Sequence, residues 1–190
     1  MTDPILPRHG GRVLADQLRI QDVDTIFGVP GESFLALLDG LYEHRNAIKV
    51  VTTRQEGGAS NMADAYGKLT GKVGVCAVTR GPGATNASIG VHTAFQDSTP
   101  MLLLIGQVAR DQVDREAFQE IDYRRMFGEM AKWVAQIDDA NRIPEYISHA
   151  FHVAQSGRPG PVVLALPEDM LRDVVEIADA PRAKIVQASP

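Results

Sequence analysis

Cysteine and long apolar runs are scarce or absent in this 190-residue sequence, and each scarcity excludes a class of protein. A single cysteine, Cys76, permits no internal disulfide and no cysteine-based zinc site, which favours a reducing compartment. No apolar run approaches the roughly 20 residues that a bilayer span needs, and the first residues lack the pattern of a secretion signal. We therefore expect a cytoplasmic protein without a membrane partner.

Positive charge is not in excess either. The chain has 19 Lys and Arg against 24 Asp and Glu, a net charge of −5, and its basic residues are scattered. That distribution lacks the footprint of a nucleic-acid binder. The sequence also contains no Gly-x-Ser-x-Gly elbow and no Walker lysine, which excludes two large enzyme classes. With 44% hydrophobic and 23% charged residues, the composition is that of an ordinary folded chain.

Short apolar runs alternate with segments of helical periodicity. The runs predict strands at Thr25–Val29, Ile48–Thr52, Val73–Val78, Met101–Ile105, Trp133–Ile137 and Val162–Leu166. The periodic segments predict helices at Arg12–Ile20, Ser33–Glu43, Gly57–Leu69, Ala84–Phe95 and Ile143–Gln155. Two middle strands are almost continuously apolar, as expected where helices cover both faces of a parallel sheet. The pattern predicts a doubly wound α/β fold with a mainly parallel, six-stranded sheet and helices on both faces.

Two segments depart from this alternation. Residues Ala109–Met130 form a long, charged connection without clear periodicity, and connections of that length are often functional. After Leu171 the periodicity fades into an Ala- and Pro-rich stretch that resembles a linker. We therefore predict one domain over residues 1–171 and the start of an interdomain linker over residues 172–190, with further domains outside this chain.

Glycine-rich turns follow two of the predicted strands. Gly81-Pro82-Gly83 opens a helix, so its backbone N–H groups could approach a cofactor closely, although proline at a helix start is also ordinary helix chemistry. Asn86 stands where the dinucleotide fingerprint needs its third glycine, which disfavours a nicotinamide-dependent oxidoreductase. A second turn includes Val29-Pro30-Gly31. Both turns lie at carboxyl ends of strands, where α/β sheets collect ligands.

Glu56 is the candidate catalytic residue. It follows the strand Ile48–Thr52 and opens a helix rich in small residues. A glutamate in a first helical turn often does no more than complement the helix dipole. The small residues Gly57–Ser60 nevertheless keep the helix surface flat, so that another chain or a flat ring could cover Glu56. A covered carboxylate has its charged form disfavoured, which suits a proton donor and acceptor near neutral pH.

Taken together, several motifs resemble the N-terminal pyrimidine-binding domain of thiamine-diphosphate enzymes, most closely that of the acetolactate synthase large subunit. The resemblance runs from about Gly10 to Leu171. It rests on the segments Phe27–Gly31, Arg54–Ala59, Ala65–Gly67, Thr70–Val75, Gly81–Asn86, Asp97–Pro100, Phe118–Glu120 and Gly157–Pro161.

The resemblance implies roles for particular residues. Glu56 would hydrogen-bond the N1′ nitrogen of the cofactor's aminopyrimidine, promoting the imino tautomer that takes the proton from C2 of the thiazolium. The other cofactor-binding residues would be Val29, Pro30, Gly31, Gly81, Pro82, Gly83 and Asn86. Phe118, Gln119 and Lys132 match positions near the substrate end of the site. No metal ligand is expected in this chain, because the family holds Mg²⁺ and the diphosphate in a C-terminal domain that this sequence lacks.

The implied function is decarboxylation of a small 2-keto acid followed by carboligation, a lyase or transferase reaction of a homodimer or higher homo-oligomer, with a regulatory subunit as a further possible partner. We expect these 190 residues alone to be inactive. Glu32 departs from the synthase pattern, which has a second glycine there. A 2-keto acid decarboxylase, an aldehyde lyase or a sulfoacetaldehyde acetyltransferase-like enzyme therefore stays open, as does a non-catalytic interaction module of the same fold.

Overall fold

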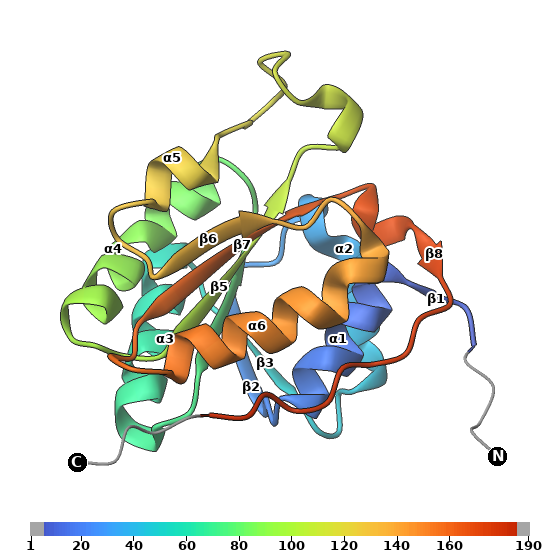
Figure 1. Ribbon diagram of the computed structural model, residues 1–190. Helices are drawn as coiled ribbons and strands as arrows, with labels where there is room; N and C mark the ends of the chain where they lie inside the picture. The colour runs from blue at the N-terminus through green and yellow to red at the C-terminus, as the bar shows by residue number, and fades with distance from the viewer. Residues whose placement is uncertain (1–5, 186–190) are drawn as a thin grey trace, which may run out of the picture.

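A six-stranded, fully parallel β-sheet forms the centre of the computed structural model, which describes residues 6–185 (Figure 1). Across the sheet the strand order is β3-β2-β4-β5-β7-β6. The strands are β2 (Thr25–Gly28), β3 (Lys49–Thr52), β4 (Gly74–Val78), β5 (Met101–Gln107), β6 (Trp133–Gln136) and β7 (Pro161–Pro167). Each corresponds to one of the predicted strands, so the predicted fold class is confirmed.

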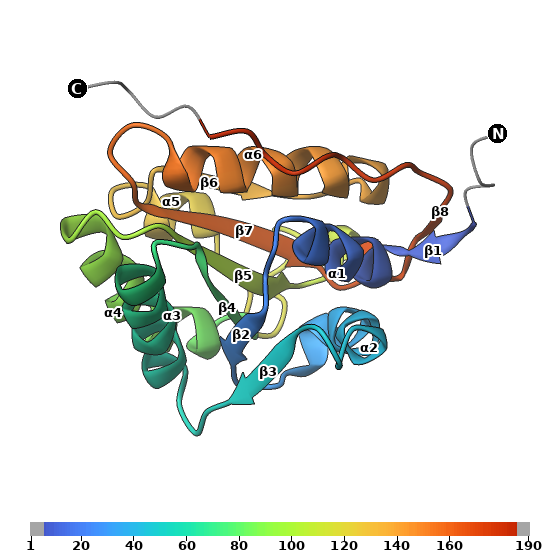
Figure 2. The ribbon, with the colours of Figure 1, turned by 90° about the horizontal axis from the view of Figure 1, so that it is seen from below.

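Helices cover both faces of the sheet, as Figure 2 shows for α1 and α6 on one side and α3 and α4 on the other. The helices are α1 (Gly10–Ile20), α2 (Leu35–Glu43), α3 (Glu56–Thr70), α4 (Pro82–Gln96), α5 (Tyr123–Phe127) and α6 (Ile143–Gln155). Short 3₁₀ turns are η1 (Glu32–Phe34), η2 (Arg110–Gln112), η3 (Ala140–Arg142) and η4 (Met170–Arg172). Within the described residues, no helix combines the length and apolar character that a bilayer span requires.

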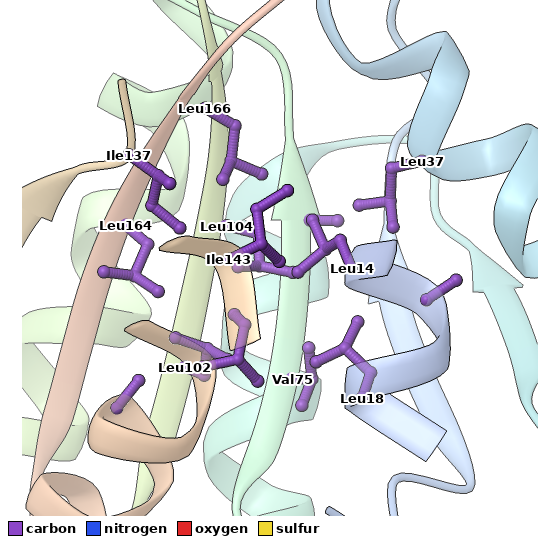
Figure 3. Packing of buried hydrophobic residues seen from close by; sticks show 14 of the residues in the cluster. Leu14, Leu18, Leu37, Val75, Leu102, Leu104, Ile137, Ile143, Leu164 and Leu166 are labelled. Carbon is purple, nitrogen blue, oxygen red and sulfur yellow. The ribbon is translucent and has the colours of Figure 1, made fainter. Parts of the chain in front are cut away.

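The core divides into two clusters, one on each face of the sheet. Every residue of β4, β5 and β7 is buried, which is the expected consequence of their continuous apolar sequences. Figure 3 shows the first cluster, where Leu102 and Leu104 of β5 meet Leu14 and Leu18 of α1 and Ile143 of α6. Complete burial of one such side chain contributes about 1.5–3 kcal/mol to the free energy of folding. The core therefore holds the strands, and the site residues at their ends, in fixed positions.

Local signals set the ends of the helices beside the site. The Gln55 side chain accepts a hydrogen bond from the Gly58 N–H at 3.1 Å and so caps the start of α3. Gly71, with φ +70°, adopts the left-handed conformation that ends this helix. Pro82 begins α4, where its missing N–H costs no hydrogen bond.

The sequence predicts that the small residues of α3 form a flat surface for another chain or a ring, and the structure shows a different arrangement. Gly57, Ala59, Ser60 and Ala63 do not form an exposed flat face but are buried within this chain. A Cβ atom added at Gly90 of α4 would lie 2.4 Å from Ser60 Oγ, which shows how closely the two helices pack. Gly57 and Ser60, three apart on one helix face, lie against α4, whereas Ala59 and Ala63 join the apolar cluster that includes side chains of β4.

The segment after Leu171 packs back on the domain. β8 (Val174–Val175) pairs antiparallel with β1 (Arg8–His9), and the chain then runs alongside α1 and α6 (Figures 1 and 2). Gln17 of α1 binds both the N–H and the carbonyl of Ala180. The described part of the predicted linker is therefore attached to the domain, and its continuation into a further domain stays a prediction.

Candidate functional site

The strand order places a topological switch point between β2 and β4. From β2 the chain moves outward to β3 and then returns to β4 on the other side of β2. Connections leaving the carboxyl ends of two such strands diverge, which opens a crevice where α/β proteins bind ligands. The turn Val29–Gly31 leaves β2 here and the turn from Thr79 to Gly81 leaves β4, so both predicted turns lie where this topology leads us to expect the crevice.

Glu56 lies beside the crevice as the first residue of α3, and its side chain is half-buried. Asn86 of α4 donates a hydrogen bond from Nδ2 to Glu56 Oε2 at 2.9 Å. A Cβ atom built at Gly83 would be 3.6 Å from Glu56 Oε1, so this second oxygen faces the start of α4. The structure thus brings three of the predicted site residues together, with Asn86 orienting the Glu56 carboxylate.

The turn before α4 is closely packed against Gln119 and Tyr123. Gly81 has φ +58°, a conformation that favours glycine, and an added Cβ would lie 2.6 Å from the Cβ of Gln119. The Gly81 N–H donates a hydrogen bond of 2.9 Å to the Tyr123 hydroxyl. Burial raises the pKa of Tyr123 to about 12, so the phenol stays protonated across the physiological range.

The turn after β2 forms the opposite wall. Val29 and Pro30 also border a small apolar recess with Ile26 and Leu41, which lies on the α1 face of the sheet and not on the face of α3 and α4. Gly31 adjoins Thr79, and the Ser33 and Thr79 hydroxyls are 2.8 Å apart, within hydrogen-bond distance. This contact ties the loop after β2 to the loop after β4, so the two walls have a fixed separation.

Glu32, the residue that departs from the synthase pattern, has a partner in Arg80. The Arg80 Nη2 atom donates a hydrogen bond of 2.7 Å to Glu32 Oε1. Arg80 directly precedes Gly81 and is 8% exposed. Arg80 was not among the residues predicted from the sequence, although its place in a strand-end turn is a signal for a residue of the site.

Two of the three predicted substrate residues lie at this edge of the sheet and one does not. Phe118 is 72% exposed and Gln119 packs on Gly81. Lys132, by contrast, precedes β6 at the amino ends of the strands, where its backbone N–H donates to the carbonyl of Pro161. Its ammonium donates to the carbonyls of Val153 and Ser156, and burial lowers its pKa. The role predicted for Lys132 has no geometric support within this chain.

Cys76 lies within β4 and is fully buried. Burial raises the pKa of its thiol, and the charge of Glu56 adds a smaller contribution in the same direction. Cys76 is therefore a packing residue rather than a nucleophile, as its position in an apolar strand predicts. Among residues 6–185, no group of three or more His, Cys, Asp or Glu side chains is arranged to hold a metal ion.

Comparisons with known proteins identify the family to which the chain belongs. Residues 8–126 match the model of the family described as "Thiamine pyrophosphate enzyme, N-terminal TPP binding domain". The chain belongs to this family of thiamine-pyrophosphate-binding domains, which confirms the family identified from the motifs.

Individual relatives point the same way. The chain is 44% identical over 163 residues to the acetolactate synthase of Arthrospira platensis, covering 85% of this chain and 28% of the relative. It is 40% identical over 185 residues to a probable acetolactate synthase large subunit of Methanococcus aeolicus, covering 96% and 31%. It is 38% identical over 161 residues to the mitochondrial acetolactate synthase catalytic subunit of Saccharomyces cerevisiae, covering 85% and 23%. The chain thus spans less than a third of the length of these curated relatives.

Proposed function

We propose that this chain is the pyrimidine-binding part of a thiamine-diphosphate-dependent enzyme that decarboxylates a 2-keto acid and transfers the remaining carbon unit, as an acetolactate synthase does. The observation that carries the proposal is the half-buried Glu56 carboxylate, oriented by Asn86 at the switch point. Relatives that align with most of this chain are acetolactate synthases, which supports the choice of reaction.

The residues at the crevice fit an aminopyrimidine ring. A carboxylate oxygen that faces Gly83 can hydrogen-bond a protonated ring nitrogen, and glycines at the turn place no side chain between backbone and ring. Bound thiamine diphosphate would supply the electron sink for decarboxylation.

Within this chain, the task of Glu56 is to hold a proton at the N1′ nitrogen of the pyrimidine. Asn86 keeps the carboxylate in place by binding Oε2, which leaves Oε1 free on the side of Gly83. Pro30, Gly31, Gly81 and Pro82 would position the ring through the two turns. Phe118 and Gln119 would line the substrate end, because Gln119 packs directly on the Gly81 turn.

The proposed enzyme needs two further components, a site for Mg²⁺ and the diphosphate and a second subunit. We propose that Mg²⁺ and the diphosphate are held by residues outside these 190 residues, and that the enzyme is a homo-oligomer in which a second subunit covers α3 and α4. The outward side of these two helices supports the second point, because Met62, Leu69 and Ile89 are exposed there. A lone chain then holds part of a site and should be inactive.

The deciding experiment uses the intact protein with thiamine diphosphate, Mg²⁺ and pyruvate, and follows carbon dioxide and acetolactate. We expect both products from the parent, a loss of about 100-fold or more in Glu56→Gln, and parental activity in Glu43→Gln, which alters an exposed carboxylate at the end of α2. Carbon dioxide without acetolactate would refute carboligation. Failure to bind thiamine diphosphate, or full activity of Glu56→Gln, would refute the proposed site.

A further inference from the structure

Arg80 connects three loops at the carboxyl edge of the sheet, and no role for it follows from the site described above. Its Nη2 donates to Glu32 Oε1 after β2, and its Nε donates a hydrogen bond of 3.1 Å to the backbone carbonyl of Phe118. Its Nη1 lies 3.6 Å from Glu168 Oε2 after β7. One planar group thereby links segments that are separated by 48, 38 and 88 residues in the sequence.

The segment that Arg80 contacts has an unusual backbone. Asp114, Glu116 and Gln119 have φ values of +62°, +53° and +65°, which non-glycine residues adopt at an energetic cost. Such a conformation persists only where the surroundings hold it. Figure 1 shows why support is needed, because the connection between β5 and α5 projects beyond the sheet.

Glu120 supplies part of the support from within the segment. Its Oε1 accepts a hydrogen bond from the Asp114 N–H at 2.7 Å, and its Oε2 accepts one from the Ala117 N–H at 3.1 Å. These bonds close the loop on itself but do not attach it to the sheet. Arg80 attaches the Phe118 end of the loop, through the Phe118 carbonyl and through its guanidinium, which lies 6.0 Å from the centre of the Phe118 ring. Gln107 of β5 attaches the following residues, because its Nε2 donates a hydrogen bond of 2.9 Å to the Ile121 carbonyl.

The guanidinium of Arg80 is buried, whereas the side chain of its partner Glu32 is 69% exposed. Arg80 is 8% exposed, and its buried Nη1 has no hydrogen-bond partner among the described residues. A charged group in this position is held by its ion pairs, and Glu32 offers the shortest one. The two residues therefore act as a unit: Glu32 holds the guanidinium at the sheet edge, and the guanidinium holds the Phe118 carbonyl.

We propose that Arg80 is a positioning residue that holds Phe118 and Gln119 against the Gly81 turn. It thereby fixes the position of these two residues at the substrate end of the site. A Cβ atom added at Gly81 would lie 2.6 Å from the Cβ of Gln119. A shift of Phe118 and Gln119 would therefore change the surface beside the Gly81 turn. The Glu32–Arg80 pair explains how an acidic side chain is accommodated in the turn beside the crevice. The catalytic part of this inference rests on the proposed function, whereas the structural part does not.

The first test measures hydrogen exchange in the intact protein. Arg80→Met should accelerate exchange of the Asp114, Ala117 and Glu120 amides by about tenfold or more, because one charge-assisted attachment is lost. Arg158→Met is the matched control, since Arg158 also donates to backbone carbonyls, those of Phe95 and Gln96, far from this loop. Unchanged exchange in Arg80→Met, or equal acceleration in the control, would overturn the proposal.

The second test separates positioning from general stability. We expect Arg80→Met to lower kcat/KM for the 2-keto acid about tenfold or more while its affinity for thiamine diphosphate stays at the parental value. If Arg80 acts through Gln119, the double variant Arg80→Met/Gln119→Ala should be no worse than Gln119→Ala alone. Additive losses would overturn the proposal. A parent protein that does not bind thiamine diphosphate would instead contradict the proposed function, and the exchange experiment would still decide whether Arg80 holds the segment.

Discussion

Gly90→Ala is the sharpest test of how the fold positions Glu56 and Asn86. Alanine is the better helix former and would by itself stabilise α4 by about 0.5–1 kcal/mol. Its Cβ, however, would lie 2.4 Å from Ser60 Oγ and 2.5 Å from the Ser60 carbonyl carbon. The hydroxyl can rotate away but the backbone atom cannot, so α3 and α4 must separate. Overpacking of this kind costs about 1–3 kcal/mol, and we expect a net loss of about 1–2 kcal/mol.

The measurement is urea unfolding of the 190-residue chain, followed by circular dichroism and by the fluorescence of Trp133, its single tryptophan. With a slope of about 2 kcal/mol per molar urea, the midpoint of Gly90→Ala should fall by about 0.5–1 M. Gly58→Ala is the matched control, because nothing lies within 4 Å of a Cβ at this exposed position of α3. Equal midpoints for the two variants would refute the reasoning.

Two further predictions concern hydrogen bonds. Tyr123→Phe leaves the buried Gly81 N–H without its partner and should cost about 1–3 kcal/mol in the same urea experiment. The pKa of Asp24 is lowered to about 2 by hydrogen bonds from Lys72 and Tyr66. Its stabilising contribution is therefore complete above the unfolded value of about 3.9 and is lost as the pH falls towards 2. Acid titration should show a shallower loss of stability over this interval in Asp24→Asn than in the parent.

Much of the fold was predictable because its signals are local. The apolar strands β4, β5 and β7 are buried on both faces, as their sequences predict, and the glycine and proline turns fall at helix starts. The five-residue helix α5 was missed, although Asp122 accepts hydrogen bonds from the Arg124 and Arg125 N–H groups as an N-cap residue does. A helix so short has too few positions to show periodicity.

The residues predicted at strand-end motifs lie close together in the structure, and their roles stay predictions. Glu56, Asn86 and the Gly81–Gly83 turn were named from the sequence, and the structure brings them together at one edge. Lys132 was named only from the family resemblance, without a strand-end motif, and lies at the other edge. A family resemblance that matches single positions does not say at which end of the sheet a residue lies. Lys132 precedes β6 and is therefore at the amino ends of the strands.

Local sequence is sufficient to specify the strands, the helix starts and the carboxylate at the first position of α3, because these depend on neighbours within a few positions. The packing of Gly57 and Ser60 of α3 against α4, and the contacts of Arg80 with Glu32 and Phe118, depend on how the whole chain folds. Those contacts join residues far apart in the chain. They arise only when the parallel sheet aligns the carboxyl ends of its strands, an arrangement that no local pattern encodes.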